Sequence, residues 1–138
     1  MSSILEMSAS DLGRAIGTGT LDPVEIAQVY LQSIEEHPEA KRIYTMTTKK
    51  RALAEAETAS IRARSGQRLS LLDGVPISWK DLFDTAGYVT EAGSDLLKGR
   101  VPQKDAFCLR EATALGLVCL GKTHMSELAF SGIGLNPV

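Results

Sequence analysis

The sequence predicts an α/β protein in which an N-terminal helical layer is followed by a strand, a helix and a second strand. The first part carries helix-start signals and apolar residues at three- and four-residue spacing. After Gly66, glycines and β-branched runs become frequent instead. A strand, a helix and a second strand favour a parallel βαβ unit with a right-handed crossover. We therefore expect residues 1–66 to be helical and residues 67–138 to begin an α/β core.

Two helices are expected at the start of the chain. Ser8 can cap a helix that runs toward Gly17. Asp22 is a stronger start signal, because a capping residue is followed by Pro23 at the first helical position. Apolar residues then recur on one face, namely Val24, Ala27, Leu31 and Ile34. This pattern ends near His37, which precedes a proline.

A third helix is expected from about Thr48 to Arg64, because this stretch is rich in alanine and alternating charges. Gly66 is a plausible stop. A face of small side chains can lie close against another element, and it consists of Ala52, Ala56, Ala59 and Ala63. We expect all three helices to form a structural layer that carries no chemistry.

The second half contains the expected βαβ unit. Residues 74–80 (GVPISWK) read as a short strand, and a glycine-containing loop follows over residues 81–104. Asp105 can cap a helix that continues through about Leu115, where a glycine breaks it. The continuous apolar run 117–120 is typical of a buried strand.

Composition excludes several classes of function. The net charge of −2 comes from 15 basic and 17 acidic residues that are well mixed, which argues against a nucleic-acid-binding face. No apolar run approaches the roughly 18 residues of a membrane span, and the N-terminus does not resemble a secretory signal. Cys108 and Cys119 lack metal-binding or redox spacing, so we expect both to be buried packing residues. A cytoplasmic protein that binds no metal is the simplest interpretation.

One nucleotide-binding pattern is present but rejected. Residues 116–123 (GLVCLGKT) satisfy the spacing of a phosphate-binding loop. Such a loop must be an exposed turn that follows a strand, with its backbone N–H groups directed at phosphate. Here the four middle residues are apolar and form the strand itself, so we expect neither nucleotide binding nor any other cofactor.

Lys80 is the most unusual residue of the first strand. Side chains alternate along a strand, so Ser78 and Lys80 share the face opposite Val75. An amine is costly to bury unless it is paired, and a buried neutral lysine can act as a base. Asp81 and Asp84 lie close in sequence. From the residues alone, we expect Lys80 to emerge at the strand end and to pair with one of these aspartates.

Four separated motifs occur in the order found in the amidase signature family. Residues 72–84 (LDGVPISWKDLFD) resemble the strand that carries the catalytic lysine of that family. Residues 90–94 (TEAGS) are similar to its Thr-x-Ala-Gly-Ser loop, and residues 116–129 (GLVCLGKTHMSELA) resemble its strand ending in Gly-Lys-Thr-Asn-x-x-Glu-Phe-Ala. Residues 21–25 (LDPVE) look like the start of its second helix. The resemblance covers essentially the whole chain and is most specific from residue 72 to residue 130.

This resemblance implies a hydrolase that cleaves carboxamides with a triad of serine, cis-serine and lysine. Lys80 matches the catalytic lysine, whereas the Gly-Gly-Ser-Ser-Gly-Gly loop that supplies the bridging serine is absent from the sequence. In that family the region after Glu127 lines the substrate pocket, so the resemblance makes Phe130 and Ser131 candidate substrate-binding residues. His124 stands where asparagine is common, and we expect a structural role for it. The implied fold is the first part of a mixed sheet with helices on both faces, and residues 1–138 would be the N-terminal portion of a larger domain.

Three functions remain open at this point. The chain can belong to an amidase that acts on a small-molecule amide, or to the glutaminase subunit of a tRNA-dependent amidotransferase. It can also be a non-catalytic module that assembles with a separately encoded remainder. The corresponding partners are a second copy of the chain in a homodimer or the other amidotransferase subunits, without direct nucleic-acid or membrane binding. We expect the chain alone to be inactive, and poorly soluble or partly unfolded, because sheet edges and apolar faces stay uncovered.

Overall fold

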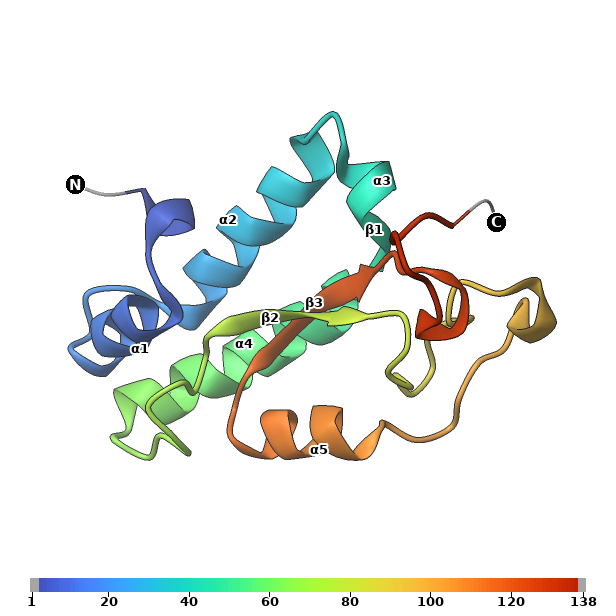
Figure 1. The fold of residues 1–138 in the computed structure, drawn as a ribbon. Coiled ribbons are helices and arrows are strands. Elements are labelled where there is room, and N and C mark those ends of the chain that lie inside the picture. Colours follow the sequence, from blue (N-terminus) through green and yellow to red (C-terminus); the bar gives the residue numbers. More distant parts are fainter. Residues whose placement is uncertain (1–2, 137–138) are drawn as a thin grey trace.

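The computed structural model describes residues 3–136 and has a mixed α/β architecture (Figure 1). Its elements are η1 (Ile4–Glu6), α1 (Ala9–Gly17), α2 (Pro23–Glu36), α3 (Ala40–Ile43), β1 (Tyr44–Thr47), α4 (Lys49–Arg64), β2 (Pro76–Lys80), η2 (Asp95–Leu97), α5 (Phe107–Ala114), β3 (Val118–Thr123) and η3 (Glu127–Ala129). The strands form one sheet in the order β1-β3-β2. β3 pairs with β2 in parallel and with β1 in antiparallel orientation. The parallel pairing of the two predicted strands is therefore confirmed.

Local capping explains where the first two long helices begin. The Ser8 side chain accepts a hydrogen bond from the backbone N–H of Asp11 at the start of α1. The Asp22 side chain accepts one from Val24 N–H at 2.9 Å, and Pro23 occupies the first turn of α2. Both predicted helix starts are confirmed, because each depends only on residues within one turn.

The predicted cap of α5 is wrong. The helix begins at Phe107, and its preceding residue Ala106 makes no side-chain capping bond. Asp105 instead accepts two hydrogen bonds from the Arg51 guanidinium, both at 2.9 Å, and one from Ala86 N–H at 2.8 Å. A charged, bidentate pair is stronger than a cap, so the tertiary contact determines the orientation of Asp105.

The sequence did not predict α3 and β1. β1 lies within the part expected to be helical, and alternate residues of this strand are exposed. Its register places Tyr44 opposite Thr123 and Thr47 opposite Gly121. The strand is only four residues long and forms its ladder with a segment far along the chain, so local sequence gives little indication of it.

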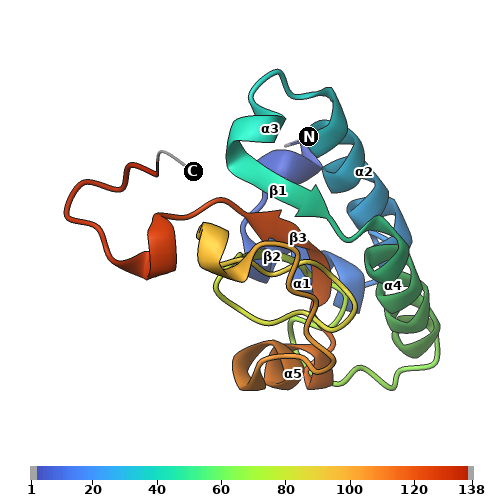
Figure 2. The ribbon, with the colours of Figure 1, turned by 90° about the vertical axis from the view of Figure 1, so that its right-hand side faces the viewer.

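The core lies between β3 and the helices α2 and α4, which lie together on one side of the sheet (Figure 2). The alanine face of α4 is confirmed as a packing surface, since Ala52 and Ala56 are buried against Val118 and Leu120 of β3. Small side chains let the helix approach the strand closely. A second cluster joins α1 to the segment that leads into β2, and it consists of Leu12, Ile16, Ile26 and Val75.

Gly116 marks the sharp turn between α5 and β3. Its φ of +88° lies in the region that favours glycine, and its α-carbon faces the carboxylate of Asp73. Asp73 is fully buried and accepts hydrogen bonds from Arg62 at 2.8 and 2.6 Å. Leu69 N–H donates to the same carboxylate at 2.9 Å. This ion pair ties the approach to β2 to the last turns of α4.

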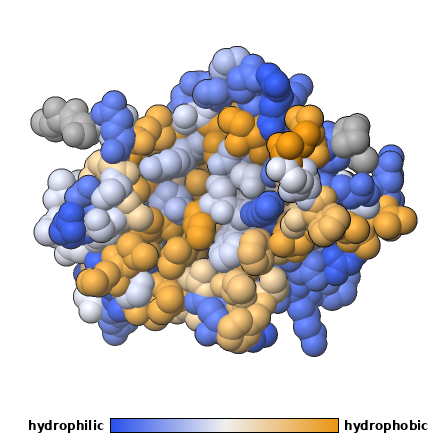
Figure 3. All heavy atoms as spheres, in the orientation of Figure 1, coloured by the Kyte–Doolittle hydropathy of each residue, from blue (hydrophilic) through white to orange (hydrophobic). Residues whose placement is uncertain are grey.

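A large share of the apolar side chains lies on the surface (Figure 3). The most exposed of them are Ile61, Leu71, Leu96, Phe107, Phe130, Ile133 and Leu135. An apolar groove of about 710 Å³ runs between α1, the segment that leads into β2 and the end of α5. Cys119 is buried as predicted, whereas Cys108 is exposed, because it lies on the outer side of α5. Within residues 3–136, the helices are too short or too polar to cross a membrane.

Candidate functional site

Lys80 is the last residue of β2 and lies at one edge of the sheet. In the parallel register Lys80 is opposite Thr123, which is the last residue of β3. The carboxyl ends of both strands therefore meet at this edge, where ligands bind in open α/β sheets. The side chain of Lys80 is exposed, and no ion pair or hydrogen bond engages it within the described part of the chain.

The backbone that follows Lys80 is fixed from two sides. Asp81 donates its N–H to the carbonyl oxygen of Thr123 at 2.9 Å, and its own carbonyl oxygen accepts from Ala92 N–H at 3.1 Å. The Asp81 carboxylate also accepts a hydrogen bond from Glu91 N–H at 3.0 Å. The hydrogen bonds that Asp81 makes to β3 and to the loop around residue 91 thus fix the backbone next to Lys80, and with it the direction of the Lys80 side chain.

Lys122 is buried completely beneath this turn. Its Nζ lies 2.9 Å from Asp81 Oδ1 and donates a hydrogen bond to Thr90 Oγ1 at 2.7 Å. Sequence reasoning missed this residue. The available signal was a lysine at the end of a buried apolar strand, which is the same feature that drew attention to Lys80.

The second nearby aspartate is also engaged. Arg100 donates to both carboxylate oxygens of Asp84, each at 2.7 Å. These hydrogen bonds from Arg100 hold the pKa of the Asp84 carboxyl below its usual value, although partial burial opposes the shift. The prediction that Lys80 pairs with Asp81 or Asp84 is therefore wrong, because Lys122 and Arg100 occupy these two carboxylates.

The two remaining motifs of the second half lie side by side at the same edge. Leu128 N–H donates to the carbonyl oxygen of Ala92 at 2.9 Å, and Ser94 Oγ donates to Glu127 at 2.7 Å. Ala92 and Gly93 both have positive φ, at +51° and +62°. The loop over residues 90–94 and the segment after β3 are thus joined by hydrogen bonds into one border next to Asp81.

Phe130 and Ser131 lie beyond this border. Phe130 is 93% exposed, and the exposed Ser131 accepts hydrogen bonds at its Oγ from Gly134 N–H at 2.9 Å and Ile133 N–H at 3.3 Å. No described contact joins either residue to Lys80. Their substrate-binding role stays a prediction.

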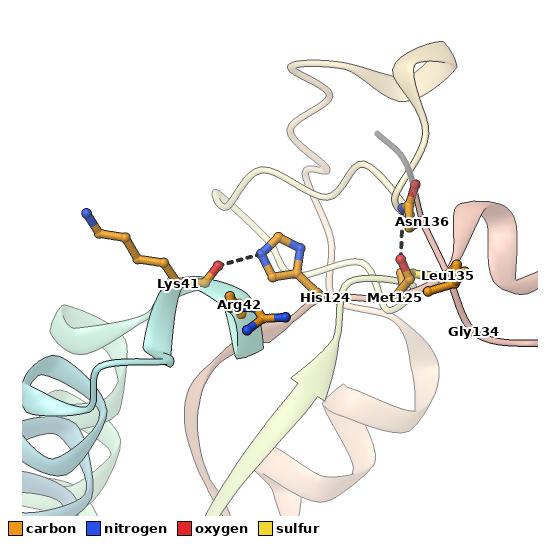
Figure 4. Close-up of a pocket in the computed structure, with 7 residues that line it drawn as sticks. All are labelled: Lys41, Arg42, His124, Met125, Gly134, Leu135 and Asn136. Carbon is orange, nitrogen blue, oxygen red and sulfur yellow. Dashed lines mark hydrogen bonds between the residues drawn. The ribbon is translucent and has the colours of Figure 1, made fainter.

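A cavity of about 600 Å³ opens next to the segment after β3 (Figure 4). It is lined by Lys41, Arg42, His124, Met125, Gly134, Leu135 and Asn136. His124 Nε2 lies 3.1 Å from the carbonyl oxygen of Lys41, whose own side chain points away from the cavity. His124 also donates its backbone N–H to Ile43. These contacts give His124 a structural position against α3.

The carboxylates next to Lys80 are paired, since Asp81 binds Lys122 and Asp84 binds Arg100. Among residues 3–136, no group of three or more His, Cys, Asp or Glu side chains is placed to hold a metal ion. The chemistry that the edge offers is that of an accessible lysine amine on a rigid turn. Such an amine can accept a proton from a hydroxyl group that is held beside it.

Comparison with known proteins identifies the family. The family model described as Amidase matches residues 25–138, which is most of the chain. The chain belongs to the amidase family. Its fold agrees with that assignment, since it superimposes on the peptide amidase of Stenotrophomonas maltophilia with a TM-score of 0.80 and 34% sequence identity.

Similar sequences include components of a larger assembly. A glutamyl-tRNA(Gln) amidotransferase subunit from Streptomyces coelicolor is 34% identical over 94% of this chain. Its mitochondrial counterpart from Ornithorhynchus anatinus is 36% identical over 91% of it. The match covers 26% and 24% of those two relatives, and 88% of this chain and 25% of the peptide amidase are superimposed. The chain therefore spans about a quarter of the length of the relatives it matches.

Proposed function

We propose that residues 1–138 form the N-terminal portion of a hydrolase domain that cleaves carboxamide C–N bonds, and that Lys80 is its proton acceptor. The observation that carries this proposal is the free Lys80 side chain at the carboxyl edge of β2. It ends a motif that matches the family's lysine strand, and both neighbouring carboxylates are paired elsewhere. Membership of the amidase family supports the reaction class.

The mechanism that we infer is a relay of one proton between three side chains. The Lys80 amine takes the proton of a bridging serine as that serine takes the proton of the nucleophilic serine. The nucleophile attacks the amide carbon, the amine leaves with a proton, and water then hydrolyses the ester. The sequence contains no Gly-Gly-Ser-Ser-Gly-Gly stretch, so both serines must come from protein outside residues 1–138.

The substrate in this proposal is a small-molecule amide bound beyond the border formed by residues 90–94 and the segment after β3. Phe130 and Ser131 are its candidate contacts. Phe130 offers an unpartnered aromatic ring, and the Ser131 hydroxyl remains able to donate a hydrogen bond. We place this chemistry in the cytoplasm, without a cofactor.

A chimera tests the role of Lys80. Residues 1–138 would replace the corresponding first quarter of the Stenotrophomonas maltophilia peptide amidase, and turnover of a peptide amide would be measured. We expect Lys80→Met to lower kcat by at least about 100-fold, the usual loss when a general base is removed. Lys98→Met is the matched control, because Lys98 is exposed and forms a surface ion pair with Asp95. Equal turnover of the Lys80→Met and unchanged chimeras would refute the proposal.

The chain should also be assayed on its own with aryl and aliphatic amides. We expect no turnover, because residues 1–138 lack the serine loop that Lys80 would serve. Clear hydrolysis that depends on Lys80 would contradict this expectation.

A second function is favoured by the names of the similar sequences. Both relatives described above are named as glutamyl-tRNA(Gln) amidotransferase subunits. We infer as the alternative that the chain belongs to the glutaminase subunit of such an assembly, with other subunits as partners. Release of ammonia from glutamine that appears only after those subunits are added would favour this alternative over an amidase that acts alone or as a homodimer.

A further inference from the structure

Two aspartates lie within four residues of Lys80, and each is held by another cation. We propose that Lys122 and Arg100 are positioning residues that keep the Lys80 amine free of a carboxylate partner. The use of that free amine as a base rests on the proposed function. Its freedom is a property of the described chain and can be measured without any turnover.

Lys122 holds Asp81 from below the turn. The ammonium group is fully buried, 2.9 Å from Asp81 Oδ1, and its next partner is Thr90 Oγ1. A buried ammonium without a counter-charge is strongly unfavourable, so this pair must persist in the folded protein. The second oxygen of Asp81 is taken by Glu91 N–H. Oδ1 is thus held by the ion pair without a hydrogen bond from the described residues, and Oδ2 is held by the hydrogen bond from Glu91.

The inward direction of Asp81 also determines the direction of Lys80. Neighbouring side chains in an extended segment point to opposite faces. Asp81 is 3% exposed, whereas Lys80 is exposed. Turning Asp81 outward to reach Lys80 would leave Lys122 buried and unpaired, which excludes this alternative.

Arg100 holds Asp84 on the outer side. Its planar guanidinium makes two parallel hydrogen bonds to the carboxylate, a geometry that a single amine does not reproduce. The two ion pairs meet at Thr90, whose hydroxyl binds Lys122 and whose backbone N–H donates to the carbonyl oxygen of Arg100 at 2.9 Å. Thr90 thus joins the two ion pairs that hold Asp81 and Asp84 into one network.

Pulsed acylation of lysine amines tests the proposal. The chimera that carries residues 1–138 in the peptide amidase would be treated briefly with acetic anhydride at pH 8, and the rate at Lys80 would be measured by mass spectrometry relative to the exposed Lys104. In Arg100→Gln the Asp84 carboxylate is released, and we expect Lys80 to react roughly two- to fivefold more slowly, the effect of one surface ion pair. Lys122→Met should slow Lys80 to a similar extent by releasing Asp81. The control Lys98→Met should leave the ratio unchanged.

Double variants separate charge from structure. Arg100→Gln with Asp84→Asn, and Lys122→Met with Asp81→Asn, remove the released carboxylate and should restore the rate at Lys80. An unchanged ratio in folded Arg100→Gln, or no recovery in its double variant, would overturn the proposal. Arg100 lies on the surface, so this arm decides the outcome if Lys122→Met does not fold by circular dichroism. The assay measures the amine itself, so a folded chimera without turnover would remove the proposed function without affecting this result.

Discussion

Replacement of Gly116 by alanine should destabilise the protein severely. A methyl group at this position would lie 2.1 Å from Asp73 Oδ1 and 2.5 Å from its Cγ. Asp73 has no room to retreat, because Arg62 and Leu69 N–H hold the buried carboxylate. The contact adds an overpacking cost of about 1–3 kcal/mol. The φ of +88° adds roughly 1–3 kcal/mol of backbone strain, so we expect a total loss of about 2–6 kcal/mol.

Gly66 provides a matched control for this substitution. Its φ is +70°, but an added methyl group meets nothing within 4 Å. Gly66→Ala should therefore cost only the strain, about 1–2 kcal/mol. Urea unfolding of these variants would be measured in the chimera with the peptide amidase and followed by circular dichroism. Equal losses for the two variants, within about 0.5 kcal/mol, would refute the role of the Asp73 contact.

Three further predictions concern ion pairs, pH and the exposed apolar surface. Arg51→Met should lower the free energy of unfolding by about 2–4 kcal/mol, because it leaves the carboxylates of Asp105 and Glu55 without their cation. The control Arg42→Met removes an exposed ion pair and should change that free energy by less than about 0.5 kcal/mol, as measured by urea titration. Burial raises the pKa of Asp105, but the hydrogen bonds from Arg51 and Ala86 N–H together with the positive charge of Arg51 outweigh it and hold that pKa below its usual value. The resulting stability is present above about pH 4 and is lost as pH falls through the lowered pKa. The urea midpoint should therefore drop between pH 5 and pH 3. In Asp105→Asn, which has no carboxylate to protonate at this position, the drop should be smaller. The isolated chain should bind a hydrophobic dye and melt gradually, and a sharp melt above about 60 °C would contradict this.

The parts of the fold that were predicted correctly depend on short-range chemistry. Ser8 and Asp22 cap helices within one turn, and the alanine spacing of α4 defines a single face. Local sequence gave the wrong prediction at Asp105, because its carboxylate binds the guanidinium of Arg51 on α4 instead of capping α5. Local sequence also did not predict β1, because a strand of four residues is defined mainly by its pairing with β3.

The candidate site divides in a similar way. Lys80 was identified because its strand motif is contiguous in the sequence. Lys122 was missed because its importance comes from meeting Asp81 and Thr90, which are distant in the chain. The sequence suggested that the nearest opposite charges would pair, and the fold instead connected each carboxylate to a cation from another segment.

The pairing of β1 with β3 has a consequence for how the chain is made. Tyr44 emerges from the ribosome long before Thr123, its partner in the sheet. The hydrogen-bonding edge of β1 therefore has no partner while α4, β2 and α5 are synthesised. During that interval the nascent chain presents an unpaired strand beside the helices α2 and α4, a state that invites non-native pairing with other chains. The unpaired edge of β1 is covered only once β3, which ends at Thr123, has been synthesised and can pair with it.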